Sequence, residues 1–346
     1  MARFEERRLP RPRLTRRPGR RSRRCALLLA LLALLAVCFR ALAAEVEPDG
    51  QLRGQRLYLN PDSPARKQAD AWQRSRPQEA ALMRRIADQP QAIWLGEWVR
   101  DLRREVDGIV SRSSATRSIP VFVADNIPYR DCGLHSRGGA GDGDDYRRWI
   151  IELARGLRNR PSVVILEPDG IPLIECLPAR LRDERYVLLR EAVDVLSKAG
   201  ASVYVDAGNA NWQKPTEMAN RLQAAGIVLA DGFALNVANF HGTSVNVAYG
   251  NRLSRLVGNK HYVIDTSRNG RGAAVEREWC NAPNQALGHA PTTDTGLPLV
   301  DAYLWVKVPG QSDGTCNAGP RAGQWWPEYA LGLSRAAEQL GSISPR

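Results

Sequence analysis

Residues 162–170 read Ser-Val-Val-Ile-Leu-Glu-Pro-Asp-Gly, a β-branched and aliphatic run that ends in Pro168-Asp169-Gly170. The apolar run predicts a buried strand over Ser162–Glu167, and the proline and glycine predict that a loop follows it. Helical apolar spacing precedes this strand over Asp144–Arg158, and a second helical pattern follows over Asp183–Ala199. A strand between two helices is typical of a parallel sheet covered by helices.

The same alternation extends in both directions along the chain. Further strands are predicted at Ala92–Leu95, Pro120–Ala124, Ala201–Val205, Gly232–Asn236, His261–Ile264 and Ala302–Val306. Further helices are predicted at Arg66–Arg74, Gln78–Ala87, Pro215–Ala225, Ser244–Val257 and Gln324–Gln339. This α/β pattern, about seven strands around one core, favours a parallel β/α barrel over residues 64–346, after a polar lead-in at residues 45–63. A doubly wound open sheet is the alternative.

Residues 1–44 have the layout of an export signal. An arginine-rich stretch ends at Arg24, an apolar segment runs from Cys25 to Phe39, and small residues follow at 41–44. The apolar segment is shorter than the roughly 20 residues that a membrane-spanning helix needs. We therefore expect a cleaved signal and a secreted or periplasmic protein, with an uncleaved N-terminal anchor as the alternative.

The formal net charge of +12 is concentrated in this leader. Residues 1–44 contain twelve arginines and two glutamates, which leaves a net charge of only +2 for residues 45–346. Nucleic-acid binding is therefore not indicated, because it depends on clustered Lys and Arg side chains that neutralise phosphates. We expect a monomer that contacts a membrane only if the leader is retained.

Beyond the leader, the chain has four cysteines: Cys132, Cys176, Cys280 and Cys316. No two of them have the short spacing of a chelating pair, and an even number in an exported chain favours two disulfides. Three pairings are possible, and free buried thiols are the alternative. The four histidines are scattered and no glycine-rich phosphate loop follows the first strand, so we expect no metal and no other cofactor.

Aspartates follow five of the predicted strands. They are Asp125 and Asp131 after one strand, and Asp169, Asp206, Asp265 and Asp313 after four others. A single loop aspartate commonly caps a helix or a turn. Several in equivalent positions are more informative, because the loops after parallel strands all emerge at one rim of a barrel, where barrel enzymes place their active sites.

A cluster of acids without a metal suits the hydrolysis of a glycosidic bond. One carboxylic acid protonates the leaving oxygen, and a second carboxylate or an ordered water delivers the attack. Neighbouring negative charges keep one acid protonated near neutral pH, and Arg130, Arg268 and Lys307 would keep the others ionised. All nine tryptophans lie beyond the leader, and indole rings can stack on the apolar faces of sugars.

Longer motifs in the chain are Asn126–Gly133, Val164–Asp169, Val205–Gly208, Ile264–Gly270, Glu278–Cys280 and Leu304–Gly310. Together they resemble glycoside hydrolase family 6, the inverting cellulases, in the family's order from about Leu57 to Ala337. The resemblance implies a distorted parallel barrel with the substrate cleft across the C-terminal rim of its strands. It also implies the sequential disulfides Cys132–Cys176 and Cys280–Cys316.

Matched position by position, the resemblance implies that Asp169 is the general acid. Asp131 would raise the pKa of Asp169 and help draw a proton from water. Asp313 would take the place of the disputed base, and Asp206 would support the group. The substrate-binding positions implied are Trp94, Trp212 and Trp279 for stacking on sugars, and Asn239 and Lys307 for hydroxyl groups.

Three positions depart from the family pattern. Asp125 stands where the family has a tyrosine that distorts the sugar, Asn209 replaces a histidine, and Gln311 replaces a glutamate that binds hydroxyls. Our hypothesis is that Asp125 modifies the proton chemistry near Asp131. In the family that the chain resembles, short loops go with internal cutting, so the resemblance, with the short Cys280–Cys316 segment and the compact region after Cys176, implies internal cutting of β-1,4-glucan. The alternatives are a hydrolase acting on another β-glucan or an exopolysaccharide, and a glycan-binding protein with little turnover.

Overall fold

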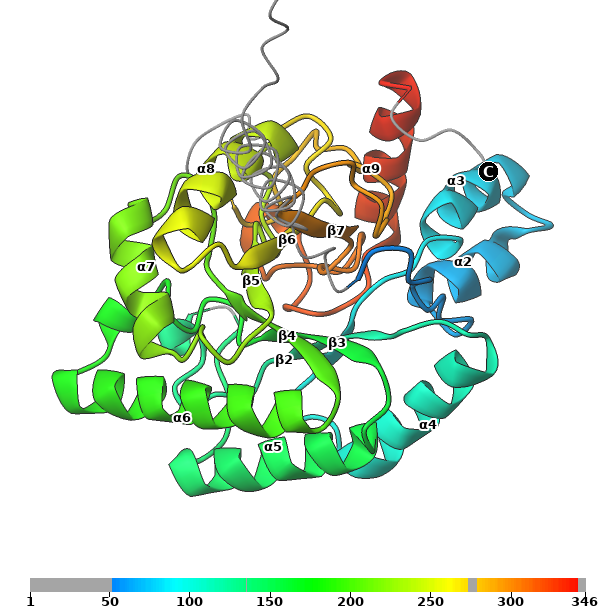
Figure 1. Ribbon diagram of the computed structural model, residues 1–346. Coiled ribbons are helices and arrows are strands. Elements are labelled where there is room, and N and C mark those ends of the chain that lie inside the picture. The colour runs from blue at the N-terminus through cyan, green and yellow to red at the C-terminus, as the bar shows by residue number, and fades with distance from the viewer. Residues whose placement is uncertain (1–51, 135, 273–278, 342–346) are drawn as a thin grey trace, which may run out of the picture. The chain divides into compact units, whose positions relative to one another are not determined.

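The apolar runs of the sequence form parallel strands that pair in chain order. The computed structural model describes residues 52–134, 136–272 and 279–341. Its strands are β1 (Ile93–Leu95), β2 (Val121–Ala124), β3 (Ser162–Leu166), β4 (Ala201–Asp206), β5 (Gly232–Leu235), β6 (His261–Asp265) and β7 (Val300–Leu304). Each strand pairs in parallel with the next, in the order β1 to β7. The backbone N–H of Ala92 donates to the carbonyl of Trp305 at 2.9 Å, which links the two edges. The predicted distorted barrel is confirmed (Figure 1).

Helices cover the outside of this curled sheet. They are α2 (Pro64–Trp72), α3 (Pro77–Ala87), α4 (Leu102–Ala115), α5 (Gly143–Leu157), α6 (Ala179–Lys198), α7 (Pro215–Ala224), α8 (Thr243–Leu256) and α9 (Pro327–Gln339). Seven match predicted helices within a few residues, but α4 was not predicted. Its buried residues Leu102, Val106, Ile109 and Val110 have helical spacing. Gly108 and the closing run of serines lower its helix propensity and hide the pattern.

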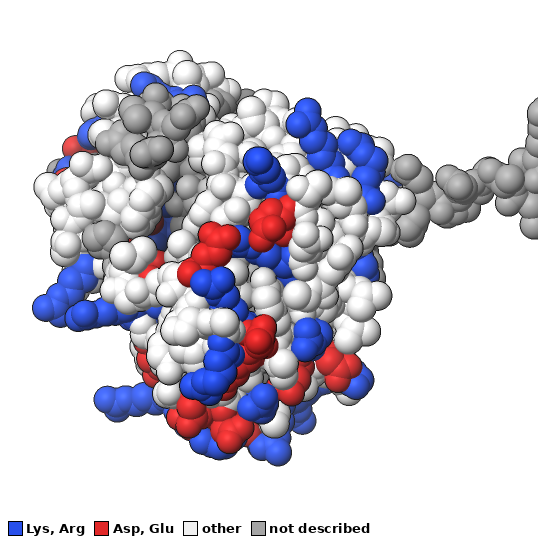
Figure 2. All heavy atoms as spheres, turned by 90° about the vertical axis from the view of Figure 1, so that its left-hand side faces the viewer, with Lys and Arg blue, Asp and Glu red and all other residues white. Residues whose placement is uncertain are grey.

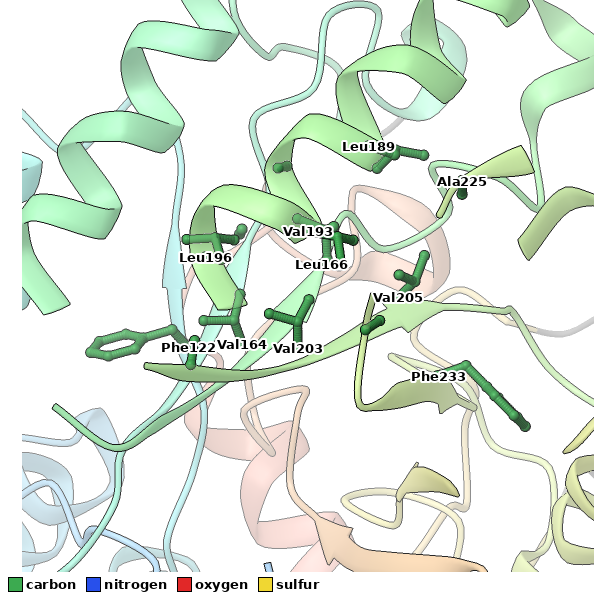
Figure 3. Close-up of a cluster of buried hydrophobic side chains, with 14 of the residues drawn as sticks. Phe122, Val164, Leu166, Leu189, Val193, Leu196, Val203, Val205, Ala225 and Phe233 are labelled. Carbon is green, nitrogen blue, oxygen red and sulfur yellow. The ribbon is translucent and has the colours of Figure 1, made fainter. Parts of the chain in front are cut away.

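Both faces of the strands are apolar, as expected of a parallel sheet buried on both sides. In β3, Val164 and Leu166 belong to the cluster under the helices, whereas Val163 and Ile165 belong to the cluster inside the barrel. Figure 3 shows Val164, Leu166, Val203 and Val205 facing Leu189, Val193 and Leu196 of α6. The period of two therefore turns Tyr204 and Asp206 of β4 toward the barrel interior.

Two disulfides tie the loops at the C-terminal rim. Cys132–Cys176 joins the loop after β2 to the segment after β3, and Cys280–Cys316 joins the loops after β6 and β7. The sequential pairing is confirmed. Residues 52–63 add the buried side chains of Leu52, Leu57 and Tyr58 to the fold.

The expected export signal and the first part of the lead-in, residues 45–51, lie outside the described residues. Within the described ranges, no helix is long and apolar enough to cross a membrane. On the face seen in Figure 2, Lys and Arg side chains are interspersed with Asp and Glu side chains. That face therefore has no single-sign basic patch of the kind that binds phosphates.

Candidate active site

A cleft of about 720 Å³ lies at the C-terminal rim of the strands. This volume is within the range of about 300–1,000 Å³ found for ligand pockets. Of the residues predicted from the sequence, the cleft is lined by Trp94, Asp125, Asp131, Asp169, Asn239, Trp279, Lys307, Gln311 and Asp313. The cleft lining does not include Asp206, Trp212 or Asn209. The sequence pattern therefore brings together residues from five separate loops.

Asp206 lies directly beneath the cleft as the last residue of β4. Its Oδ2 accepts hydrogen bonds from the backbone N–H of Asp169 at 2.9 Å and of Gly208 at 3.3 Å. Its Oδ1 has no hydrogen-bond partner among the described residues. Burial raises the pKa of Asp206 to about 7. Asp206 thus positions the Asp169 backbone through a buried carboxyl that gains a proton easily.

Asp169 presents its side chain to the cleft from a strained turn. Its φ is +64° and that of Glu167 is +49°, in the left-handed region that non-glycine residues rarely adopt. Burial, and then the negative charges of Asp206 and Asp131, raise the pKa of Asp169 well above its usual range. An acid in this environment holds its proton more tightly than a solvent-exposed aspartic acid and can donate it to a group bound in the cleft.

Glu167 holds the loop that follows β2. Its carboxylate accepts the backbone N–H of Asn126 at 3.0 Å and of Ile127 at 3.0 Å. Burial, together with the charge of Asp125, raises the pKa of Glu167 to about 8. The sequence places Glu167 at the end of a strand, but its role as the anchor of a neighbouring loop depends on strand pairing and was not predicted.

Asp265 is a second anchor of this kind. Its two carboxylate oxygens accept four backbone N–H groups, from Ala238, Ser267, Val306 and Lys307, at 2.9 to 3.2 Å. This one side chain therefore fixes the loops after β5, β6 and β7 against each other. Asp265 was predicted to converge on the rim, but it does not line the cleft.

Asp125 lies at the cleft beside a buried arginine. The Arg130 Nε is 3.6 Å from a carboxylate oxygen of Asp125, and Arg130 also donates to Glu97 at 2.8 Å and to the Ser136 carbonyl at 2.7 Å. Burial raises the pKa of Asp125 to about 7, although the charge of Arg130 acts in the opposite direction. Asp125 is therefore a further titratable acid in the cleft.

Asp313 is held in the ionised form by two cations. The Arg268 guanidinium donates to Oδ2 at 2.8 Å, Lys307 Nζ lies 3.1 Å from Oδ1, and the Asn281 N–H donates at 2.9 Å. Burial alone would raise the pKa of Asp313, but Arg268 and Lys307 outweigh it and lower the pKa below its usual value. The cleft thus holds one acid whose pKa is raised, Asp169, and one whose pKa is lowered, Asp313.

Aromatic and polar side chains complete the walls of the cleft. The Trp94 indole N–H donates to the Val306 carbonyl at 2.8 Å, and Lys307 Nζ lies 5.8 Å from the centre of its ring. Trp279 is 45% exposed, which leaves ring surface available to a ligand. Further lining residues are Gln89, Gln91, Trp98 and Gln324. For Trp98, the available signal was its position just after the first strand.

Comparisons with known proteins place the chain among glycoside hydrolases. The model of the family described as "Glycosyl hydrolases family 6" matches residues 52–337. The chain is 41% identical to Endoglucanase A of Cellulomonas fimi over 284 residues, which cover 81% of this chain and 61% of that protein. It is 36% identical to Endoglucanase 1 of Streptomyces halstedii over 322 residues, which cover 89% of this chain and 98% of that protein.

A solved structure is also similar. It is the endoglucanase Cel6 of Mycobacterium tuberculosis in complex with methyl-cellobiosyl-4-deoxy-4-thio-β-D-cellobioside, with 40% sequence identity and a TM-score of 0.79. The match covers 84% of this chain and 100% of that chain. The chain spans less than two thirds of the Cellulomonas fimi protein, but the whole of the Mycobacterium tuberculosis chain.

Proposed function

The chain belongs to the glycosyl hydrolases of family 6, and from this premise we propose that it is an inverting endo-β-1,4-glucanase with Asp169 as general acid. The observation that carries the proposal is that an acid of raised pKa and an acid of lowered pKa line one cleft. Asp169 has a raised pKa and Asp313 a lowered one. The raised pKa of Asp169 suits a general acid, and the ionised Asp313 supplies a fixed negative charge in the same cleft.

The proton of Asp169 goes to the oxygen of the leaving sugar as the glycosidic bond breaks. Asp131 assists from the loop after β2, because its negative charge contributes to the raised pKa of Asp169. A water molecule attacks the opposite face of the sugar and loses its proton toward Asp131 through a short water chain. Asp206 supports the acid by holding its backbone at 2.9 Å.

Asp313 acts in this proposal as an ionised carboxylate that stabilises positive charge on the sugar or activates the water. Its fixed pairing with Arg268 and Lys307 makes it a weak base, because both cations stabilise the ionised form.

The glucan chain lies along the cleft on aromatic surfaces. Trp94 and Trp279 stack on sugar rings, and Lys307, Asn239 and Gln311 bind hydroxyl groups from the same lining. Trp212 is half-buried and stands outside the lining, so its assignment as a stacking residue requires the substrate to extend beyond the cleft. The endoglucanase names of the relatives and the cellobioside bound in the Mycobacterium tuberculosis structure support a β-1,4-glucan as substrate.

The decisive experiment identifies the anomer released from a soluble cello-oligosaccharide by nuclear magnetic resonance. We expect the α-anomer at early times, because single displacement of a β-glycosidic bond inverts the configuration. Asp169→Ala is expected to lose at least about 100-fold in kcat on this substrate, as general acids contribute about 10²–10⁴-fold. It should retain much more activity on a dinitrophenyl cellobioside, whose leaving group needs no proton. Release of the β-anomer would overturn the inverting mechanism.

The site of action belongs to the same proposal. Two disulfides suit an oxidising compartment outside the cytosol, and the leader has the composition of an export signal. We therefore assign the protein to the cell exterior or the periplasm. N-terminal sequencing of the mature protein tests this, since cleavage close to Ala43 or Ala44 is expected.

A further inference from the structure

Trp98 is an exposed aromatic residue in the wall of the cleft. It follows β1 in the loop Gly96-Glu97-Trp98, lines the cleft and is 51% exposed. By contrast, Trp305 is 1% exposed and serves the core. A large ring left half in solvent costs hydrophobic free energy, and in a ligand cleft such a ring is available for binding.

The ring of Trp98 is held in place from two sides. A Cβ atom added at Gly96 would lie 2.3 Å from a ring carbon of Trp98, so the ring packs directly on the glycine backbone. The guanidinium carbon of Arg130 lies 5.2 Å from the ring centre, a distance at which a cation is attracted to an aromatic face. Arg130 is buried and fixed by Glu97 and Ser136. The indole is therefore preorganised, which lowers the entropic cost of binding.

The strand order places Trp98 away from Asp169, the proposed general acid. Trp98 follows β1 and Asp169 follows β3, with β2 between them. Because neighbouring strands lie about 4.8 Å apart, the two loops start about 10 Å from each other. A sugar resting on Trp98 is therefore not the unit whose bond Asp169 protonates. Ser136 and Arg137 line the same cleft and supply polar groups near the indole.

We propose that Trp98 is a stacking platform for a β-linked glucosyl unit of the substrate that lies away from the cleaved bond. This inference rests on the proposed function, because it names a further subsite of the same cleft. The platform adds affinity only for chains long enough to reach it, so Trp98 determines the preference for substrate length.

The test measures kcat/KM on cello-oligosaccharides from three to six units for the wild type, Trp98→Ala and Trp98→Phe. We expect Trp98→Ala to lose about tenfold in kcat/KM on cellohexaose, since aromatic stacking contributes about 0.5–1.5 kcal/mol. On the shortest oligosaccharide that the enzyme cleaves, kcat and kcat/KM should remain within about twofold. Trp98→Phe should recover part of the loss on cellohexaose.

Trp72 offers a matched control. An arginine also lies over its ring, with the Arg76 guanidinium carbon 4.0 Å from the ring centre, but Trp72 does not line the cleft. Trp72→Phe should leave the dependence of kcat/KM on chain length unchanged. Thermal melting of each variant separates a loss of binding from a loss of folded protein.

Two kinetic outcomes would overturn the inference. One is an equal loss for Trp98→Ala at every chain length, which would mean that the ring acts through Arg130 on the acids. The other is no loss on any substrate. If the wild type cleaved none of these substrates, the proposed function would fail separately. Calorimetric titration would then measure how tightly cellohexaose binds to Asp169→Asn and to the double variant Asp169→Asn/Trp98→Ala. Equal dissociation constants would refute the role of Trp98 in binding.

Discussion

Several residues in the loops around the cleft have a strained backbone. Tyr129, Asp131, Glu167, Asp169 and Ala238 all have φ between +49° and +64°, although none is a glycine. Such conformations cost about 1–3 kcal/mol each and persist only where the surroundings impose them. Here buried carboxylates do so: Asp206 binds the Asp169 N–H and Asp265 binds the Ala238 N–H. At the residue scale, the backbone of the cleft residues is therefore held in position by buried acids that do not themselves line the cleft.

Asp125 gives the clearest prediction at this scale. Its negative charge is one of the causes of the raised pKa of Asp169. Removing that charge in Asp125→Asn makes Asp169 easier to ionise, so the pKa of Asp169 falls. A general acid is active only while protonated, and the alkaline limb of the kcat profile should therefore move to lower pH. The measurement is kcat on cellohexaose across pH 4 to 9.

A remote carboxylate supplies the control for this experiment. Asp194 lies on α6, pairs with Lys198 at 2.7 Å and does not line the cleft. Asp194→Asn changes the net charge equally and should leave the profile unmoved. An unchanged alkaline limb in Asp125→Asn, or a shift toward higher pH, would contradict the coupling between Asp125 and Asp169.

At the element scale, the strands could be predicted and the anchors between them could not. Each strand is a short apolar run followed by a polar loop, and this pattern is local. The contact of Glu167 with the Asn126 N–H joins residues far apart in sequence, and no local pattern contains it. Helix α4 was missed for the opposite reason: its local propensity is weak, and packing on α5 stabilises it. Gly156 lies so close to Val106 that an added Cβ would approach it to 2.7 Å.

The disulfide Cys132–Cys176 is expected to stabilise the protein and to keep the loop of Asp131 in position. It closes a segment of 44 residues and holds the loop of Asp131 to the segment after β3. Replacing both cysteines by serine should lower the free energy of unfolding by about 2–5 kcal/mol, because the crosslink restricts the unfolded chain. It should also lower kcat on cellohexaose, since Asp131 is adjacent to Cys132. Urea unfolding and steady-state kinetics measure the two effects, and identical urea midpoints for the variant and the oxidised wild type would disprove the first.

For the whole molecule, the two sides of the catalytic rim differ in how they are built. The β2–β3 side holds acids with raised pKa values, Asp125, Glu167 and Asp169. The β6–β7 side holds Asp313 ionised between Arg268 and Lys307. A barrel of parallel strands allows this, because every loop that follows a strand emerges at the same end. The sequence predicts the convergence of these acids, but the separation into protonated and ionised sides depends on burial and on pairings between loops.

Internal cutting is the prediction that involves the entire cleft. Trp98 is 51% exposed and Trp279 is 45% exposed, and both line the cleft. An internal segment of a long glucan can therefore bind to them directly, and the chain end does not have to enter the cleft first. An enzyme of this kind cuts at random points, and a few cuts shorten long chains greatly. We therefore expect the viscosity of carboxymethylcellulose to fall steeply while few reducing ends have formed, measured in the same reaction. Cellobiose as the sole soluble product from swollen cellulose in the first minutes, with little loss of viscosity, would instead indicate release from chain ends.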